Sequence, residues 1–264
     1  MNEAELVHSY ILNCDRLSLY LNKEVRLGIN ESSRICRILK RRINGEPLQY
    51  ILGCAEFMGL EFKVDKRVLI PRPETEVLVG AVLDRLKSES GLSGRPKILD
   101  LGTGSGCIAI SIAYLLPEAN VWAADISLSA LQLAKKNAIW HKLKIKFLRS
   151  DIFSAFKKGR DQFDLIISNP PYVSKGELRG LAREISFEPR LALEAGVDGL
   201  EYYRRIISQT SDYLKDSGFL ILEMGSGQRG AIESLIKKSK NFEAIEVIKD
   251  YNNIERVIVV RNSK

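Results

Sequence analysis

Residues 98–110 read ILDLGTGSGCIAI, and this stretch decides the fold because it joins an apolar strand pattern to a helix pattern through a glycine-rich turn. The apolar residues up to Leu101 predict a short buried strand. Gly102, Gly104 and Gly106 then fill the turn that precedes the helix. Such a turn lets a ligand approach the backbone closely and directs helix N-terminal amides toward it. We therefore predict an α/β fold with a ligand at this end of the strand.

The same alternation of strand and helix patterns continues to the end of the chain. A helix is expected over residues 75–89, and strands are expected at 97–101, 120–124, 144–148, 163–168, 218–223, 243–248 and 255–260. Helical patterns lie between the first five strands, which predicts a mainly parallel sheet wrapped by helices. Only KDYNNI separates the last two strands, which is too short for a parallel crossover. The prediction is a seven-stranded Rossmann-like sheet with one reversed strand.

The chain before this sheet has a different pattern. From Asn2 to about Leu48 the apolar residues recur at three and four, which predicts a small helical bundle. The following stretch predicts two strands around a turn at Asp65–Lys66, ending at Pro71. We therefore divide the chain into an N-terminal helical domain (1–56), a β-hairpin linker (57–74) and the sheet domain (75–264).

Composition narrows the class of protein. Hydrophobic residues make up 45% and charged residues 28% of the chain, which is ordinary for a soluble globular protein. No apolar run approaches the ~18 residues that span a bilayer, so we expect a cytoplasmic protein without membrane contact. Four scattered cysteines and two histidines lack zinc-site spacing, so no metal is expected. The dinucleotide fingerprint would need glycine where Cys107 stands, which disfavours a dehydrogenase.

The formal net charge of +7 suits a nucleic-acid partner, but solvated surfaces often carry such a charge. The densest basic run extends from Arg34 to Arg42. Its apolar residues follow helical spacing, so a solvated helix face is favoured over a binding patch.

Two further strands end in residues that suit a nucleoside. Asp125 leaves the second strand, where a carboxylate can accept both hydrogen bonds of a ribose diol; alternatively, Asp125 or Ser127 caps the next helix. Asp151 and Ile152 follow the third strand. Asp151 could accept from an adenine amino group, and Ile152 either packs on the ring or belongs to the core.

The motif SNPPY follows the strand at residues 163–168. Proline cannot donate to a sheet ladder, so Pro170 and Pro171 end the strand and leave Asn169 at the ligand-binding edge. The Asn169 side-chain oxygen and the Pro170 carbonyl can accept both N–H bonds of a planar amide. The prolines make these acceptors rigid, and Tyr172 would pack on the amide and exclude water. Catalysis here would be mostly positioning.

These motifs resemble the class I S-adenosylmethionine-dependent methyltransferases, and within them the HemK/PrmC type that methylates a glutamine side-chain nitrogen in peptide chain release factors. The resemblance covers nearly the whole chain and rests on EPLQYILGCAEFMGL, VLIPRPETEVLV, ILDLGTGSGCIAI, ADIS, DLIISNPPY, FEPRLALEAGVDGL, LILEMG and DYNNIERVIVV. It implies S-adenosyl-L-methionine as cofactor, S-adenosyl-L-homocysteine as product, and an N-terminal domain that docks the protein substrate.

The resemblance also implies roles for single residues. The turn Gly102, Thr103, Gly104, Ser105 and Gly106 would contact the methionine part of the cofactor. Asp125 would bind the ribose, Ile152 would lie beside the adenine, and Asn169 would border the cofactor. The target glutamine would be held by Asn169, Pro170, Pro171 and Tyr172, among which Asn169, Pro170 and Tyr172 are the predicted catalytic residues.

Several functions stay open on the sequence. The expected partner is a release factor, bound by a monomer with no direct need for nucleic acid. A ribosomal protein is an alternative glutamine substrate. The Asn-Pro-Pro-Tyr word also occurs in nucleic-acid adenine N6-methyltransferases, although no separate base-reading region is visible here. A cofactor-binding module without catalysis is the alternative from another class.

Overall fold

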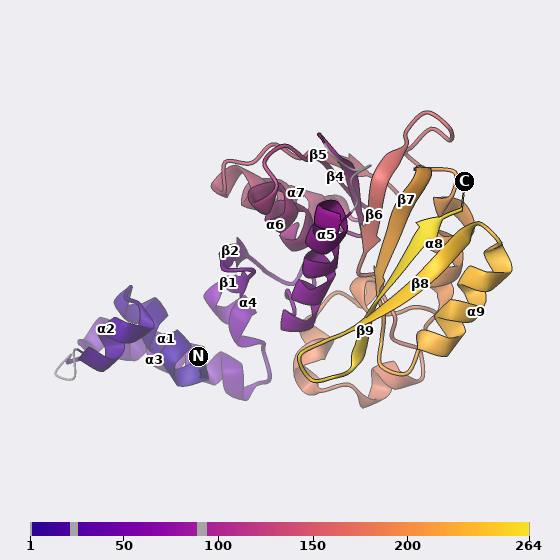
Figure 1. Ribbon diagram of the computed structural model, residues 1–264. Coiled ribbons are helices and arrows are strands. Elements are labelled where there is room, and N and C mark those ends of the chain that lie inside the picture. The colour runs from indigo at the N-terminus through magenta and orange to yellow at the C-terminus, as the bar shows by residue number, and fades with distance from the viewer. Residues whose placement is uncertain (1, 22–25, 89–93, 264) are drawn as a thin grey trace.

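The computed structural model describes residues 2–21, 26–88 and 94–263. Figure 1 shows a small helical part beside a larger domain built on a twisted sheet. No helix among the described residues is long and apolar enough to cross a membrane. The helices are α1 (Glu3–Leu12), α2 (Arg16–Leu21), α3 (Ile29–Ile43), α4 (Leu48–Leu52), α5 (Glu76–Ser88), α6 (Cys107–Leu115), α7 (Leu128–Trp140), α8 (Glu201–Thr210) and α9 (Arg229–Ser239). The strands are β1 (Cys54–Phe57), β2 (Leu60–Lys63), β3 (Lys97–Leu101), β4 (Asn120–Asp125), β5 (Lys146–Arg149), β6 (Phe163–Ser168), β7 (Leu214–Glu223), β8 (Phe242–Lys249) and β9 (Glu255–Asn262).

The main sheet has seven strands in the order β5-β4-β3-β6-β7-β9-β8. Strands β3 to β7 pair in parallel, whereas β9 runs antiparallel to both β7 and β8. This confirms the predicted fold class and the final antiparallel hairpin. From β3 the chain adds β4 and β5 on one side of the sheet and then returns to add β6 on the other side of β3. The carboxyl ends of β3 and β6 therefore lie at the switch point where such sheets bind ligands.

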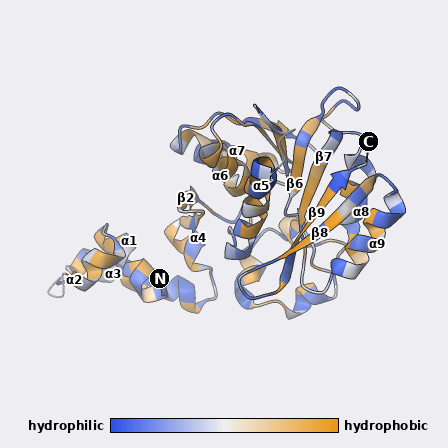
Figure 2. Cartoon of the chain, viewed as in Figure 1, coloured by the Kyte–Doolittle hydropathy of each residue, from blue (hydrophilic) through white to orange (hydrophobic). Residues whose placement is uncertain are grey.

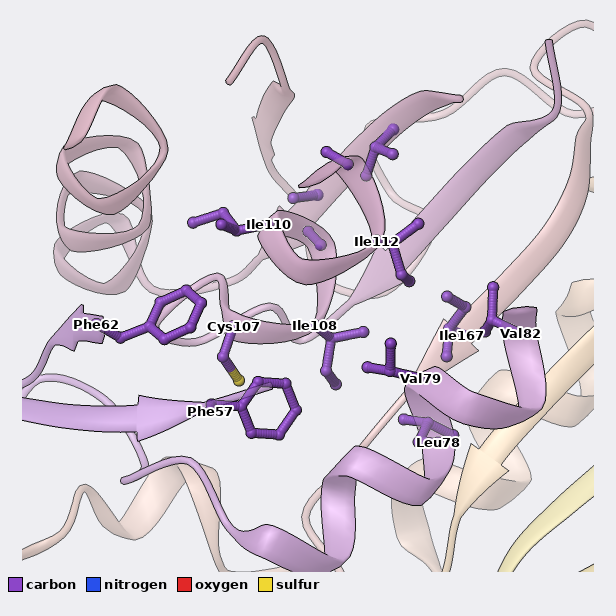
Figure 3. Packing of buried hydrophobic residues seen from close by; sticks show 14 of the residues in the cluster. Phe57, Phe62, Leu78, Val79, Val82, Cys107, Ile108, Ile110, Ile112 and Ile167 are labelled. Atoms are coloured by element: carbon purple, nitrogen blue, oxygen red, sulfur yellow. The ribbon is translucent and has the colours of Figure 1, made fainter. Parts of the chain in front are cut away.

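Two apolar layers enclose the sheet, and its strands are largely hydrophobic in Figure 2. Helices α5, α6 and α7 pack on one face, and α8 and α9 pack on the other. The small hairpin β1–β2 extends the first layer: Phe57 and Phe62 are buried beside Cys107 and Ile108 of α6 (Figure 3). The start of α6 therefore packs between the hairpin and the main sheet.

The N-terminal part forms the predicted helical bundle. Its own core contains Val7, Ile11, Ile38 and Leu48. The basic run lies on α3, where the side chains of Arg34, Arg37 and Arg41 are exposed, as expected for a solvated face. Arg42 differs, because it is half-buried and forms ion pairs with Glu3 and Glu184.

The predicted position of the hairpin turn is wrong. Strands β1 and β2 pair around Met58–Gly59, with Phe57 opposite Leu60. Both turn residues have positive φ, which glycine adopts readily and which suits a two-residue hairpin. Asp65 lies beyond the hairpin and binds the Arg67 guanidinium.

The helix expected between β5 and β6 is also absent, because the described residues 150–162 form turns. Phe153 and Phe156 have helical spacing and are buried, which explains the prediction. However, Ile152 has a φ of 51°, outside the helical region. The Ser150 hydroxyl donates to the Ile152 carbonyl at 2.7 Å and accepts from the Ala155 N–H, which holds the turn.

Candidate active site

A cleft lies at the carboxyl ends of β3, β4 and β6 and collects residues from separate predicted motifs. Its lining includes Gly102, Gly104, Asp125, Ser127, Asp151, Ile152, Asn169, Pro170 and Pro171. The described residues contain no group of three or more His, Cys, Asp or Glu that could hold a metal ion. The cleft lining combines backbone, carboxylate, amide, hydroxyl and apolar groups with the guanidinium of Arg67.

Two glycines of the turn face this cleft. Gly102 and Gly104 have φ of 75° and 55°, a region that other residues rarely adopt. A Cβ atom on Gly102 would meet no heavy atom within 4 Å, and one on Gly104 would meet only the Gly102 carbonyl oxygen at 3.9 Å. Their backbone is therefore open to a ligand.

The other residues of the turn do not line the cleft. A Cβ atom on Gly106 would lie 2.9 Å from Ile110 Cδ1 and 3.1 Å from Ala134 Cβ, so this glycine allows the start of α6 to pack closely on α7. Thr103 and Ser105 are buried, and the Thr103 hydroxyl donates to Asp100 Oδ2 at 2.6 Å. Burial raises the pKa of Asp100 to about 7. Thr103, Ser105 and Gly106 therefore stabilise the turn through packing and hydrogen bonding and do not face the cleft.

Asp125 holds the glycine turn against the end of β4. Its carboxylate accepts from the Gly104 N–H at 2.9 Å and from the Ser127 N–H at 2.8 Å, on different oxygens. Each oxygen has a further lone pair, so the carboxylate can still accept from a diol. Burial raises the pKa of Asp125. Ser127, rather than Asp125, caps α7 by accepting from the Ala130 N–H.

The part of the cleft that follows β4 and β5 contains apolar side chains. Ile152 lines it together with Ile126, whose side chain is exposed. Asp151 also lines the cleft, but its Oδ2 accepts from Arg205 Nη2 at 2.7 Å. Ile152 is half-buried, so it serves both the cleft and the core.

Sequence reasoning missed part of the lining. The missed residues include Arg67, Val68, Leu69, Pro189, Leu191, Ala192 and Tyr202. Most of them lie in the stretches VLIPRP and EPRLAL, which carried the resemblance but had received no role. No periodic pattern marks them, because irregular segments bring them to the cleft.

Asn169 has a fixed orientation. Its Nδ2 donates to the hydroxyl of buried Thr75 at 3.1 Å. Behind it lies Glu223, 1% exposed, whose pKa burial raises to about 7, while hydrogen bonds from Thr75 and Asn169 oppose this shift. With Nδ2 used in this way, the Asn169 Oδ1 atom is the acceptor left for a ligand.

Tyr172 lies apart from the first cleft. It lines a second cavity of about 490 Å³ between the helical part and the sheet domain. Its carbonyl accepts from Gln228 Nε2 at 3.0 Å, and a Cβ atom on Gly199 would lie 2.5 Å from the same carbonyl oxygen. Burial raises the pKa of the Tyr172 phenol. The Asn-Pro-Pro-Tyr segment thus separates two cavities.

Comparisons with known proteins agree with this architecture. The family model "Methyltransferase small domain" matches residues 79–196, and the model "PrmC N-terminal domain" matches residues 1–53. A methyltransferase structure from Pyrococcus furiosus aligns with a TM-score of 0.55 at 18% identity, over 87% of this chain and 98% of that one. The structural likeness concerns the fold.

Full-length relatives give the family. A release factor glutamine methyltransferase of Thermodesulfovibrio yellowstonii is 40% identical, covering 100% of this chain and 93% of the relative. One of Chlorobaculum tepidum is 42% identical over 96% of this chain and 87% of the relative. With the helical domain, the sheet and the Asn-Pro-Pro-Tyr edge all present, the chain belongs to the release factor glutamine methyltransferase family.

Proposed function

We propose that this protein transfers a methyl group from S-adenosyl-L-methionine to the side-chain amide nitrogen, N5, of the glutamine in the Gly-Gly-Gln motif of release factors. The relatives with this name support the substrate. The observation that carries the chemistry is the hydrogen bond from Asn169 Nδ2 to Thr75, because it leaves an oxygen acceptor at the cleft.

The cleft residues fit the proposed cofactor. Gly102 and Gly104 leave open backbone beside the methionine part, and Asp125 has unused acceptor capacity for the ribose hydroxyls. Ile126 and Ile152 provide apolar contact for the adenine. The bound cofactor would supply an electrophilic methyl group on its sulfonium sulfur.

The residues of this chain would act by orientation. An amide nitrogen is a poor nucleophile because its lone pair is delocalised into the carbonyl. Asn169 Oδ1 and the Pro170 carbonyl would accept its two N–H bonds and aim the nitrogen at the methyl group. On accepting the methyl group, the amide nitrogen would release one proton to solvent, and S-adenosyl-L-homocysteine would be the other product. Tyr172 would pack on the substrate from the second cavity.

The experiment is methyl transfer from labelled S-adenosyl-L-methionine to a purified release factor. Its Gln→Ala variant at the Gly-Gly-Gln tip, ribosomal proteins and unmethylated DNA serve as parallel acceptors. We expect label on the wild-type factor alone. Label on ribosomal proteins or DNA would assign another substrate, and the absence of label on every acceptor would favour the non-catalytic module.

Asn169→Ala tests the role of the amide. We expect it to remove most of the turnover while the dissociation constant of the cofactor changes only a few-fold, because the lost acceptor orients the substrate. Near-normal turnover would contradict the assigned role. The proposal includes a monomeric, cytoplasmic enzyme that needs no nucleic acid; gel filtration with light scattering tests the monomer.

A further inference from the structure

The second cavity is strongly acidic. It lies between the N-terminal helices and the sheet domain and is about 490 Å³ in volume. Its charged lining residues are Glu3, Glu74, Glu184, Glu188, Glu223, Arg72 and Arg256. Carboxylates therefore outnumber guanidinium groups in the wall, and the ion pairs decide which charges are compensated.

Neighbouring arginines compensate some of the carboxylates. Glu3 and Glu184 share Arg42, at 2.9 and 2.5 Å from its Nη2 atom. Glu188 pairs with Arg72. Because Glu3 and Glu184 share one guanidinium, their cluster keeps a net negative charge, whereas Glu188 and Arg72 balance each other.

Arg256 compensates Glu223 only in part, because its positive charge lowers the pKa of Glu223 although the two side chains form no ion pair. Its guanidinium binds Asp250 Oδ2 at 3.1 Å and donates to the Met224 carbonyl. Across the part of the chain that the structure describes, Glu74 and Glu223 form no ion pair. Burial is the main cause of the raised pKa of Glu223; the negative charge of Glu74 adds to it, and Arg256 opposes it.

Two deeply buried oxygen atoms lack partners in this wall. Within the described residues, neither Glu188 Oε2 nor Glu223 Oε2 has a hydrogen-bond partner. The Glu188 side chain is 1% exposed, and Glu223 as a residue is 1% exposed. A buried carboxylate oxygen without a donor is costly, so the wall beside the cavity keeps uncompensated acceptor capacity.

The chemistry of the wall selects the kind of donor. The described residues provide no cluster of three metal-binding side chains here, which disfavours a metal ion. Glu74 and Glu223, which form no ion pair in the described part of the chain, match an ammonium or guanidinium group, whose N–H bonds all donate. A volume of about 490 Å³ can hold a long basic side chain.

We propose that this cavity binds a positively charged side chain of the polypeptide substrate, close in space to the target glutamine. The inference rests on the proposed function and specifies what the substrate presents. Tyr172 lines this cavity, and Glu223 connects it to Asn169 through their hydrogen bond. A glutamine at Asn169 therefore brings its neighbouring residues to the acidic wall.

The experiment varies Glu74, which is outside the residues assigned to chemistry. Michaelis constants for a full-length release factor are measured with wild type, Glu74→Gln and Glu74→Lys. We expect the Michaelis constant to rise about 5-fold and at least 10-fold respectively, with kcat and the cofactor dissociation constant within 2-fold of wild type. Glu243→Gln and Glu243→Lys make the same charge changes on an exposed residue of β8 and should change nothing.

A second measurement isolates the side chain of the ligand. Short glutamine peptides with lysine or norleucine at each flanking position compete with the release factor. At one position at least, lysine should inhibit about 10-fold better than norleucine, and Glu74→Lys should abolish this preference. Equal inhibition at every position, or unchanged Michaelis constants in both Glu74 variants, overturns the inference. No methylation of the release factor by wild type would instead overturn the proposed function.

Discussion

At the scale of single residues, the orientation of one amide is the main determinant of the proposed chemistry. An asparagine amide can present either its oxygen or its nitrogen to a ligand, and only the oxygen can accept from a glutamine –NH2. The buried Thr75 hydroxyl and the Glu223 carboxylate lie behind Asn169 and bind its nitrogen. This pair therefore fixes which atom faces the substrate.

Thr75→Val tests that role because it keeps the shape and removes the hydroxyl. One hydrogen bond is worth about 1 kcal/mol, so we expect kcat to fall about 5-fold. The cofactor dissociation constant should stay within 2-fold, because Thr75 is not in the cleft wall. Thr75→Ser keeps the hydroxyl and should restore most of the turnover. Equal kcat values in the valine and serine variants would rule out the positioning role.

At the scale of elements, the glycine turn and β4 are coupled through Asp125. The carboxylate binds the Gly104 N–H directly, so it shapes the turn as well as offering acceptors to a ligand. Loss of the carboxylate should then weaken cofactor binding in two ways.

We predict that Asp125→Ala raises the cofactor dissociation constant by about 10- to 100-fold, equivalent to about 1 to 3 kcal/mol. Isothermal titration calorimetry measures it. Glu118→Ala removes an exposed carboxylate just before β4 and should bind the cofactor normally. An unchanged constant for Asp125→Ala would mean that neither role of the carboxylate contributes to binding.

The elements also show what could be predicted from the sequence. Strands such as β3 and β6 match their apolar runs, because a buried strand needs little beyond hydrophobicity and a definite stop. The hairpin turn was misplaced because two left-handed residues, Met58 and Gly59, form it outside the usual Asn-Gly or Asp-Gly signal. Ile152 interrupts a helical pattern through backbone conformation, which periodicity does not reveal.

The candidate site was predictable to the same degree. Gly102, Asp125 and Asn169 stand at strand ends, and the topology alone brings these ends together. Thr75 and Glu223 escaped notice because their contact with Asn169 joins segments distant in the sequence. Tyr172 was expected beside the first cleft, but the backbone after Pro171 directs it toward the second cavity.

At the scale of the whole molecule, the sheet domain contains two buried acids, Asp100 and Glu223, that form no ion pair within the described residues. Each has one carboxylate oxygen without a partner among the described residues. Burial raises the pKa of each to about 7. Such groups lower the stability of the folded protein at neutral pH, because folding must bury their charge. Their presence therefore indicates a functional role.

The pH dependence of stability follows from these two groups. An unfolded glutamate titrates near 4.3, so between about pH 4.3 and 7 the folded chain holds more protons than the unfolded chain. Stability contributed by Glu223 therefore falls as the pH rises through this window, and the cost is complete above pH 7.

Glu223→Gln removes this titration while keeping one oxygen acceptor. We predict that the variant is more stable than wild type at pH 8, by on the order of 1 to 3 kcal/mol, and that the difference shrinks toward pH 4.5. Urea unfolding at several pH values measures it, with Glu243→Gln as the control for a lost exposed charge. Because other titrating groups are shared, they cancel in the difference between variants. A constant difference across the pH range would show that Glu223 is charged in the folded protein throughout, stabilised by Thr75, Asn169 and the nearby Arg256 more than burial opposes it.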